Sequence, residues 1–253
     1  KTTIAVNLAL TLQDTLPVMV LDCDVEEPNA HLFLRPEFTD QTRVFSTIPV
    51  VDEHKCDGSG KCSAFCNFNA IAMVRGKPMI FTELCHGCGG CTMVCPQKAI
   101  DEEPREIGCT HKGTAKGIPV VQGYLEIGSP LAPMVVEAVR SHAPKEHGEM
   151  AIIIDASPGS SCAVVAAAEG TDYCILVTEP TPFGLNDLKL AVGLARKLNL
   201  PYGVIVNRAG LGDGSVYDYC RKENIPILME IPFDHAYAAC YAKGRRLVEE
   251  FPH

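Results

Sequence analysis

The stretch PVMVLD (17–22) is a short apolar run that ends in a carboxylate, and the same pattern recurs along the chain. Similar runs are IPVVQGYLEI (118–127), MAIIID (150–155), YCILVTE (173–179), YGVIVN (202–207) and IPILMEIP (225–232). Segments with helical spacing separate them: TTIAVNLALTL (2–12), APMVVEAVRSH (132–142), GLNDLKLAVGLARKL (184–198) and YAACYAKGRRLVEEF (237–251). Strands that are apolar throughout are buried on both faces. The pattern therefore predicts an α/β fold with a mostly parallel sheet flanked by helices.

The composition is ordinary for a soluble globular protein, with 47% hydrophobic and 21% charged residues in a chain of 253. The net charge of -9, without a block of Lys and Arg, argues against nucleic acid as a partner. No apolar run approaches the roughly 20 residues that span a bilayer, so we expect no integral membrane segment. No signal peptide is visible. The sequence begins at Lys1 rather than at a methionine, so the true amino terminus is not necessarily shown.

The distribution of the 13 cysteines indicates metal binding, because seven of them fall between Cys56 and Cys95. A dense cluster in a chain without a signal peptide points to a metal site in a reducing compartment, which we expect to be the cytoplasm. The remaining six are expected to be small buried hydrophobic residues. They are Cys23, Cys109, Cys162, Cys174, Cys220 and Cys240.

The segment CHGCGGCTMVCP (85–96) has the spacing C-x2-C-x2-C-x3-C-P. Three closely spaced thiolates bind three irons of one cubane, and the fourth cysteine binds the other cluster. A zinc site is the alternative, but zinc closes with four ligands and does not need a three-plus-one pattern. The spacing therefore predicts iron–sulfur clusters in a two-site module of the bacterial ferredoxin type.

The segment CDGSGKCSAFCN (56–67) repeats the motif, with Ser59 in place of the second cysteine and Asn67 in place of the proline. Crossed ligation predicts a complete [4Fe–4S] cluster on Cys66, Cys85, Cys88 and Cys91. The other site keeps Cys56, Cys62 and Cys95, with Ser59 at the fourth position. A serine hydroxyl is a harder and less acidic ligand than a thiol, so it holds iron weakly. We expect a [3Fe–4S] cluster or a [4Fe–4S] cluster with one labile iron there, rather than a disused site.

The segment around the cysteines interrupts the pattern of strands and helices. It is rich in Cys and Gly, lacks long helices and contains IAMVRGKPMIF (71–81), which predicts a hairpin turning at Arg75-Gly76-Lys77. We expect a small α+β, ferredoxin-like domain of residues 51–107, inserted through short linkers into a larger domain of residues 1–50 and 108–253. Such an insert buries little core, so its clusters would hold it together.

Polar residues stand at helix and strand ends where ligands of parallel sheets bind. Lys1-Thr2-Thr3 opens a helix as the end of a Walker A motif does, with lysine on phosphates and the next hydroxyl on Mg²⁺. The glycines and the strand that normally precede such a lysine are not in this sequence. LDCDVEEPN (21–29) offers Asp22 and Asp24 for Mg²⁺ and an attacking water.

Three later strand ends extend this set. IIIDASPG (152–159) supplies Asp155 and a Pro158-Gly159 turn that would direct a backbone N–H at a γ-phosphate. VIVNRAG (204–210) and EIPFD (230–234) supply Asn207 and Asp234, with the flanking Arg208 and Pro232, for an adenine edge. Each aspartate alone is also explained by capping of the next helix. We expect all of these residues to lie at the same edge of one sheet.

Together with VTEPTPFGLNDLK (177–189) and GYLEIGSPLAPMVVEAV (123–139), these motifs resemble the deviant-Walker P-loop ATPases related to MinD and the nitrogenase iron protein. They resemble most closely the subgroup with an inserted two-cluster ferredoxin domain. The resemblance implies ATP or ADP with Mg²⁺, bound in a homodimer or in a heterodimer with a related ATPase. It assigns Lys1 to phosphate, Thr2 to Mg²⁺, Asp24 to water activation, and Asn207 with Asp234 to adenine. Thr3, Asp22 and Asp155 complete the nucleotide site, with Lys1, Asp24 and Asp155 as catalytic residues.

Two functions fit these residues. The first is a Mg²⁺-dependent ATPase that couples ATP binding and hydrolysis to electron transfer or cluster handling, with a redox or cluster-accepting protein as partner. Such coupling requires that ATP bind two conformations with different affinity. The alternative is a non-hydrolysing ferredoxin-type electron carrier, or a scaffold for cluster assembly, on a P-loop fold.

Overall fold

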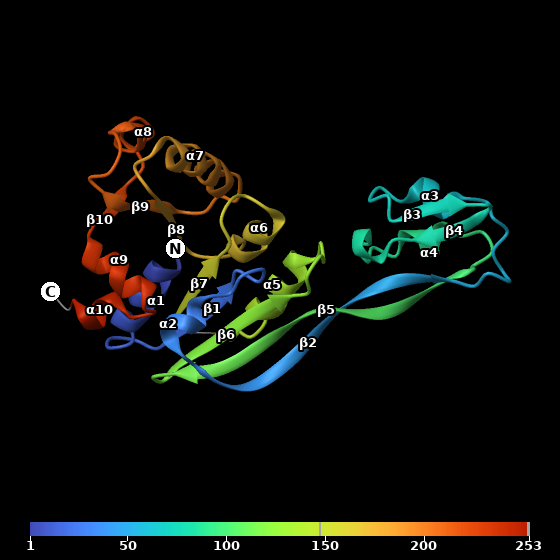
Figure 1. Ribbon diagram of the computed structural model, residues 1–253, viewed down its shortest axis with the longest axis horizontal. Helices are drawn as coiled ribbons and strands as arrows, with labels where there is room; N and C mark the ends of the chain where they lie inside the picture. Colours follow the sequence, from blue (N-terminus) through green and yellow to red (C-terminus); the bar gives the residue numbers. More distant parts are fainter. Residues whose placement is uncertain (147, 252–253) are drawn as a thin grey trace.

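The computed structural model describes residues 1–146 and 148–251, which form an α/β body and a long arm (Figure 1). The larger sheet has the strand order β2-β5-β6-β1-β7. Its strands are β1 (Val18–Cys23), β2 (Glu37–Val51), β5 (Ile100–Ala115), β6 (Ile118–Leu125) and β7 (Ala151–Ala156). Strand β1 runs parallel to β6 and β7, whereas β5 is antiparallel to both of its neighbours. The body therefore has a parallel centre, and its antiparallel edge leads into the arm.

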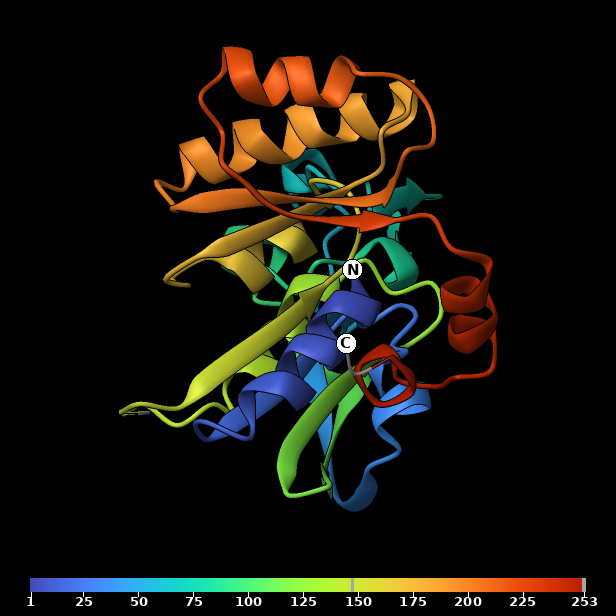
Figure 2. The same ribbon diagram turned by 90° about the vertical axis from the view of Figure 1, so that its left-hand side faces the viewer.

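A second sheet contains three parallel strands in the order β10-β9-β8. They are β8 (Cys174–Thr178), β9 (Tyr202–Ala209) and β10 (Ile227–Pro232). Helices α7 (Pro182–Lys197) and α8 (Ser215–Lys222) lie on one face of this sheet (Figure 2). Among the described residues, β7 pairs only with β1 and β8 only with β9. The two sheets therefore have facing edges that are not joined by hydrogen bonds.

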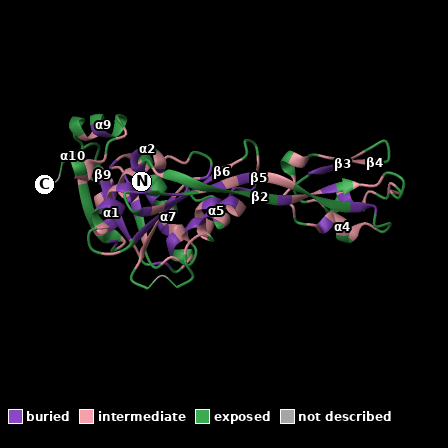
Figure 3. Ribbon diagram, turned by 90° about the horizontal axis from the view of Figure 1, so that it is seen from below, coloured by how far each residue is buried: buried purple, intermediate pink, exposed green. Residues whose placement is uncertain are grey.

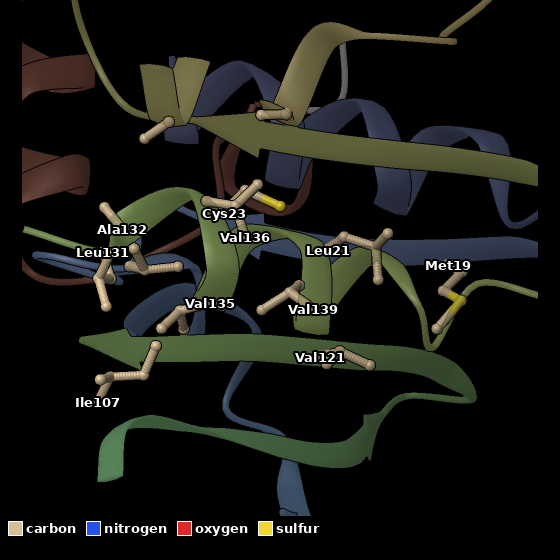
Figure 4. Close-up of a cluster of buried hydrophobic side chains, with 13 residues drawn as sticks. Met19, Leu21, Cys23, Ile107, Val121, Leu131, Ala132, Val135, Val136 and Val139 are labelled. Carbon is tan, nitrogen blue, oxygen red and sulfur yellow. The ribbon is translucent and has the colours of Figure 1, made fainter. Parts of the chain in front are cut away.

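Helices cover both faces of the larger sheet. On one face, α5 (Ala132–Arg140) packs Val135, Val136 and Val139 against Leu21 and Val121 (Figure 4). Helix α6 (Cys162–Ala168) extends this layer. On the other face lie α1 (Thr2–Leu12) and α2 (Ala30–Leu34). Strand β1 is buried at every position, as a strand between two helical layers must be. The predicted α/β fold with a mostly parallel sheet flanked by helices is confirmed.

The last predicted helix, 237–251, is two helices, so that prediction is wrong. Helix α9 (His235–Ala242) is followed by α10 (Leu247–Glu250), with Gly244 between them at a φ of +61°. A left-handed residue ends an α-helix, and glycine adopts that conformation without a steric penalty. No helix among the residues that the structure describes is both long and apolar enough to cross a membrane.

The arm is a two-stranded ribbon formed by β2 and β5, which pair from Glu37 and Thr114 to Val51 and Ile100. Strand β6 accompanies β5 only as far as Gly108. Beyond an irregularity in the register at Val44 and Phe45, the ribbon leaves the body (Figures 1 and 3). The expectation of short linkers is therefore wrong. The ribbon is largely solvated, and its sequence lacks the apolar alternation that marks a strand with one buried face.

Residues 52–99, called the cysteine module below, lie at the far end of the ribbon. The module contains α3 (Lys61–Phe65), β3 (Ile71–Val74), β4 (Lys77–Ile80), the 3-10 helix η1 (Thr82–Leu84) and α4 (Gly90–Val94). Strands β3 and β4 form the predicted hairpin, with positive φ angles at Arg75 and Gly76. Its small core centres on Cys62, Ile71 and Ile100. The domain limits 51–107 remain a prediction.

Candidate functional site

Lys1 lies at the carboxyl end of β7, where helix α1 begins. Its Nζ donates a hydrogen bond to the carbonyl oxygen of Ala156 at 3.1 Å. Burial lowers the pKa of Lys1, while the nearby carboxylates of Asp155 and Asp24 oppose that shift. The structure thus gathers the three predicted catalytic residues, with an ammonium group close to two carboxylates.

Asp22 is fully buried, and the backbone occupies both of its carboxylate oxygens. Oδ2 accepts hydrogen bonds from the N–H groups of Asn29 and Ala30, each at 2.9 Å, and Oδ1 accepts one from Asp24 at 3.2 Å. Burial raises the pKa of Asp22 to about 7, and the neighbouring Asp155 adds to the increase. These contacts match the helix-capping alternative, so Asp22 positions the loop that carries Asp24. Its role as a nucleotide ligand stays a prediction.

Asp155 pairs with Asp22 in the register of β7 and β1 and is 3% exposed. Burial raises its pKa, whereas the Thr2 hydroxyl and Lys1 oppose the shift. Its Oδ2 has no hydrogen-bond partner among the described residues. A buried carboxylate oxygen without a partner, beside a threonine hydroxyl, is the kind of oxygen donor set that Mg²⁺ takes. The residues present therefore fit a Mg²⁺ ion held by Thr2 and Asp155.

Ser157 joins the two loops at this end of the sheet, because its Oγ donates to Oδ1 of Asp24 at 2.8 Å. Sequence reasoning missed Ser157 although it lies within the quoted segment DASPG. The neighbouring Pro158 and Gly159 are exposed, and Gly159 has a φ of +90° with open space around it. Thr3 is half-buried in the first turn of α1. The backbone of the loop after β7 is thus accessible to solvent at Pro158 and Gly159.

The predicted adenine-binding residues lie on the second sheet. Pro232 pairs with Ala209, so the ends of β10 and β9 carry Asp234 and Asn207 close to each other in the fold. Asp234 accepts a hydrogen bond from Ala236 N at 2.6 Å and so caps α9. Arg208 forms an exposed ion pair with Glu179 at 3.4 Å. The expectation of a single sheet edge is wrong for the described residues, since no described strand joins β7 to β8.

The cysteine module contains a cavity of about 240 Å³. All four predicted ligands of the complete cluster line it: Cys66, Cys85, Cys88 and Cys91. The apolar rings of Phe65 and Phe68 also line it, and Cys88 is the exposed one of these four thiols. Cysteines of two motifs that are separate in the sequence thus line one cavity, as the predicted crossed ligation requires.

The remaining three cysteines lie close to one another in the module. Burial raises the pKa of Cys62, and the neighbouring Cys56 and Cys95 raise it further. Cys95 accepts a hydrogen bond from Ala99 N at 3.2 Å, and Cys62 is only 8% exposed. The predicted incomplete site therefore also brings its three thiols together.

The two cysteine loops have the same backbone conformation. Gly58 and Gly60 have φ angles of +69° and +72°, and Gly87 and Gly89 have angles of +63° and +70°. The second glycine of each pair caps a five-residue helix, α3 or α4. Ser59 therefore stands in its loop where Cys88 stands in the other. The left-handed glycines on both sides bend each loop around its central residue.

The cysteine sites differ from a single-ion site. Among residues 1–146 and 148–251, no three His, Cys, Asp or Glu side chains converge as they would around one metal ion. Zinc draws four ligands to about 2.3 Å from one centre. An iron–sulfide cube keeps its thiolates further apart, at its corners. The described residues therefore contain no preformed single-ion site, and the iron–sulfur clusters stay a prediction.

Three of the six scattered cysteines are buried, as expected, and Cys109 and Cys174 are partly buried. The buried ones are Cys23, Cys220 and Cys240, of which Cys23 and Cys220 belong to hydrophobic clusters. Cys162 is exposed, so the expectation is wrong there, because this residue begins α6 at the solvated end of the helix. Cys109 is partly buried on β5, with its Sγ 3.6 Å from Nε2 of His111.

Residues 1–248 match the family described as the CobQ/CobB/MinD/ParA nucleotide binding domain, CbiA. Two uncharacterised proteins of Methanocaldococcus jannaschii are 28% identical to the chain. One matches over 257 residues, 98% of this chain and 87% of its own length, and the other over 232 residues, 92% and 82%. An iron–sulfur cluster carrier protein of Aquifex aeolicus is 28% identical over 116 residues, which is 40% of this chain and 32% of that protein.

Solved structures with similar folds include the septum site-determining protein MinD of Pyrococcus horikoshii, complexed with Mg-ADP. It has a TM-score of 0.56 and 17% identity, and the match covers 100% of this chain and 84% of that one. A ParA family ATPase of Chlorobium tepidum has the same TM-score with 14% identity, covering 99% and 86%. At this identity the likeness concerns the fold alone. With the family match over nearly its whole length, the chain belongs to the CobQ/CobB/MinD/ParA family of nucleotide-binding domains.

Proposed function

We propose that this protein binds Mg-ATP in its body and iron–sulfur clusters in its cysteine module, and that it couples ATP turnover to electron transfer or cluster transfer. The observation that carries the proposal is the cavity lined by Cys66, Cys85, Cys88 and Cys91, in a chain whose body belongs to a nucleotide-binding family. The relative from Aquifex aeolicus supports cluster handling, since it is named an iron–sulfur cluster carrier protein.

The nucleotide residues have separate roles in this proposal. Lys1 neutralises phosphate charge, and Thr2 with Asp155 holds Mg²⁺. Asp24 orients and deprotonates the attacking water, and the hydrogen bond from Ser157 fixes its carboxylate. Asn207 and Asp234 bind the adenine edge from the ends of β9 and β10.

The cysteine residues hold the clusters, which supply one-electron redox chemistry when bound. Cys66, Cys85, Cys88 and Cys91 hold the complete [4Fe–4S] cluster, and Cys56, Cys62 and Cys95 hold the second one. Cys88 is exposed, so electrons would pass to a partner on that side of the module.

The two sites of one chain are too far apart for direct contact. Asp22 is separated from Gln41 by three strand spacings, because Gln122 and His111 lie between them in register. Thr47, at the cluster cavity, is a further six residues along β2. With strands about 4.8 Å apart and about 3.3 Å per residue, the separation is about 25 Å. Coupling is therefore conformational, and we propose that it operates in a homodimer or in a heterodimer with a related ATPase.

The test is anaerobic purification of the protein in its natural length, followed by cluster spectroscopy and ATP turnover on the same sample. We expect iron and acid-labile sulfide, with Mg²⁺-dependent phosphate release. A Cys85→Ala, Cys91→Ala variant should lose the [4Fe–4S] signal and keep nucleotide binding. An iron-free preparation, or zinc on these thiols, would overturn the proposal.

The alternatives give different results in the same experiment. Clusters that change redox state without any ATP turnover would favour a ferredoxin-type carrier. Transfer of clusters to an apo-acceptor, measured with and without ATP, identifies an assembly scaffold. Clusters that stay bound during incubation with the acceptor would exclude it.

A further inference from the structure

A second cavity lies in the body, at the end of α2 and beside the turn between β5 and β6. Its volume is about 490 Å³, and ligand pockets of proteins commonly measure about 300–1,000 Å³. We propose that this cavity binds the phosphate group of a small phosphorylated molecule through Arg35, Lys116 and Arg246. None of these residues belongs to the nucleotide or cluster sites proposed above.

The cavity is separate from the nucleotide residues because it lies at the other end of the larger sheet. Strand β6 begins at Ile118 and runs parallel to β1, so the turn that holds Lys116 lies at the amino ends of both strands. Gln122 pairs with Asp22 near the carboxyl end of β1. At about 3.3 Å per residue, the strand from Ile118 to Gln122 alone spans about 13 Å, and the cavity lies beyond it.

Cations from three distant parts of the chain line the cavity. Arg35 follows α2, Lys116 lies in the turn between β5 and β6, and Arg246 precedes α10. The Arg246 side chain is only 19% exposed, so its guanidinium is held among packed neighbours. Charges that converge in a hollow attract an anion more strongly than the same charges spread over an open surface.

Two carboxylates neutralise these cations only in part. Glu249 forms ion pairs with both Lys116 and Arg246, the second at 2.8 Å between Nε and Oε2. Arg35 forms no ion pair within the described part of the chain. Glu37 also lines the cavity, so three cations face two carboxylates there. The cavity thus keeps a positive charge in a protein whose net charge is -9.

Hydroxyl groups complete the set of donors. Thr39 and Thr114 line the same cavity. The register of β2 with β5 is irregular between Phe38 and Asp40, so Thr39 is the extra residue of a β-bulge. A bulge redirects the side chain of the strand in which it occurs. The donors of the cavity therefore come from a local departure of β2 from regular pairing as well as from the charged residues.

A phosphate group fits these donors better than a carboxylate does. A phosphate monoester has three free oxygens and carries about -1.5 to -2 charges at pH 7, whereas a carboxylate has two oxygens and one charge. The planar guanidinium of arginine matches two phosphate oxygens at once, and lysine adds a compact positive charge. With two arginines and one lysine along the wall, a phosphate uses donors that a carboxylate would leave unpaired.

The arrangement is ordered before any ligand binds. Val248 packs against the core under α1 and α2, and its N–H donates a hydrogen bond to Oδ1 of Asn7 at 3.0 Å. The ion pair of Lys116 with Glu249 joins α10 to the turn before β6. Side chains that are already ordered lose little entropy on binding, so Arg246 and Lys116 are preorganised for an anion.

The test is calorimetric titration of the full-length protein with inorganic pyrophosphate, without Mg²⁺, for wild type, Arg35→Asn and Lys116→Asn. Both positions have a positive φ, +54° and +50°, which asparagine adopts readily, so the fold is retained. We expect saturable binding to wild type. Each substitution should raise the Kd about tenfold, the usual effect of losing one charge-assisted hydrogen bond.

The matched control is Arg75→Asn. Arg75 is exposed, has a φ of +50° and precedes a glycine in a hairpin turn, as Lys116 does, but it lies in the cysteine module. Its substitution removes the same charge from the same kind of turn, so the Kd should equal that of wild type. Thermal unfolding of all variants checks that the fold is unchanged.

A variant with the opposite expected sign tests the charge balance. Glu249→Gln removes the carboxylate that Lys116 and Arg246 share, so both cations become available to the anion. The Kd for pyrophosphate should fall several-fold. A rise in Kd, with the thermal stability of wild type retained, would show that the ion pairs and not the free cations shape the cavity.

Three outcomes would overturn the inference: no saturable binding to wild type, equal Kd values for Arg35→Asn and Arg75→Asn, or that rise in Kd for Glu249→Gln. Binding that survives in Arg35→Asn and Lys116→Asn would place the pyrophosphate elsewhere on the protein. The measurements contain no iron and no ATP turnover, so their failure leaves the proposed function untouched.

Discussion

Asp22 and Asp24 are two residues apart, yet their surroundings give them different roles. Asp22 is enclosed by backbone N–H groups, whereas Asp24 is only partly buried and bonds a serine hydroxyl from the loop after β7. A carboxylate that orients water must be reachable by water. We therefore propose that Asp24 acts in catalysis, whereas Asp22 holds the loop in place.

We expect Asp24→Asn to lower ATP turnover by about 10²- to 10⁴-fold, the usual contribution of a general base. Nucleotide binding should persist, because Lys1 and the Mg²⁺ ligands are unchanged. Phosphate release measures the first quantity and equilibrium titration with ATP the second. The matched control is Asp14→Asn, an exposed aspartate at the end of α1. Equal turnover in both variants would remove Asp24 from the catalytic set.

The raised pKa of Asp22 predicts a pH-dependent stability. The folded protein holds this proton up to about pH 7, whereas an unfolded chain loses it near pH 4. The folded state binds the proton more tightly, so the free energy of unfolding falls as the pH rises from about 4 to about 7. At about 1.4 kcal/mol per pKa unit, the loss is about 4 kcal/mol.

The Asp22→Asn variant lacks this titration, so its free energy of unfolding should vary less with pH than that of wild type. Denaturant unfolding of both proteins at several values between pH 4 and 7 measures the difference. Two parallel curves would show that Asp22 is ionised throughout this range.

At the scale of single residues, the sequence indicates which residues have a chemical role better than it indicates which contacts they make. The lysine, the strand-end aspartates and the cysteine spacing each carry a chemical signature. Ser157 does not, because an ordinary serine gains its role from a partner far along the chain. Its contact follows from the fold and cannot be read from local spacing.

Among the elements, the buried strands could be predicted and the ribbon could not. Strand β1 is apolar along its length because helices cover both faces, and that pattern is visible in the sequence. Strand β2 is mostly exposed, with polar residues on both faces and Pro49 near its end. The residues that pair in β2 and β5 are separated in the sequence by the whole cysteine module. No pattern of neighbouring residues therefore predicts this pairing.

The junction of ribbon and body predicts a sensitive glycine. A Cβ at Gly108 would lie 2.2 Å from the carbonyl oxygen of Tyr124 and 2.9 Å from Cγ2 of Val135. We expect Gly108→Ala to lower the free energy of unfolding by about 1–3 kcal/mol, the usual cost of overpacking. Chemical denaturation measures this change.

The control is Gly193→Ala, because Gly193 lies within α7 with open space around it. Alanine stabilises a helix interior by up to about 1 kcal/mol relative to glycine. The two substitutions should therefore have opposite signs. If both variants were less stable than wild type, the loss in Gly108→Ala could not be attributed to overpacking at the junction.

At the scale of the whole molecule, the body and the cysteine module have separate cores. The core around α5 takes only Ile107 and Val44 from the vicinity of the ribbon, and the core of the module consists of its own residues and the ribbon end. Removal of the cysteine module should therefore leave the packing of the body core intact, and removal of the body should leave that of the module core intact.

We expect a protein in which residues 46–105 are replaced by Asn-Gly to fold as the body alone. Phe45 and Glu106 pair directly in the ribbon, so a two-residue type I′ turn can join them. The shortened protein should bind ATP and contain no iron. Thermal unfolding, nucleotide titration and iron analysis check this expectation. An insoluble product would show that the module is needed for the body to fold.

The ribbon leaves the sheet at one place, beside Gly108, and carries the module along its outer part, where Thr47 and Pro49 line the cavity. It therefore works as a lever. At about 3.3 Å per residue, the six steps from Phe45 to Val51 span about 20 Å, so a tilt of about 10° at its base shifts the far end by about 3.5 Å. A tilt of that size at the pivot is thus magnified into a displacement as large as one residue of strand.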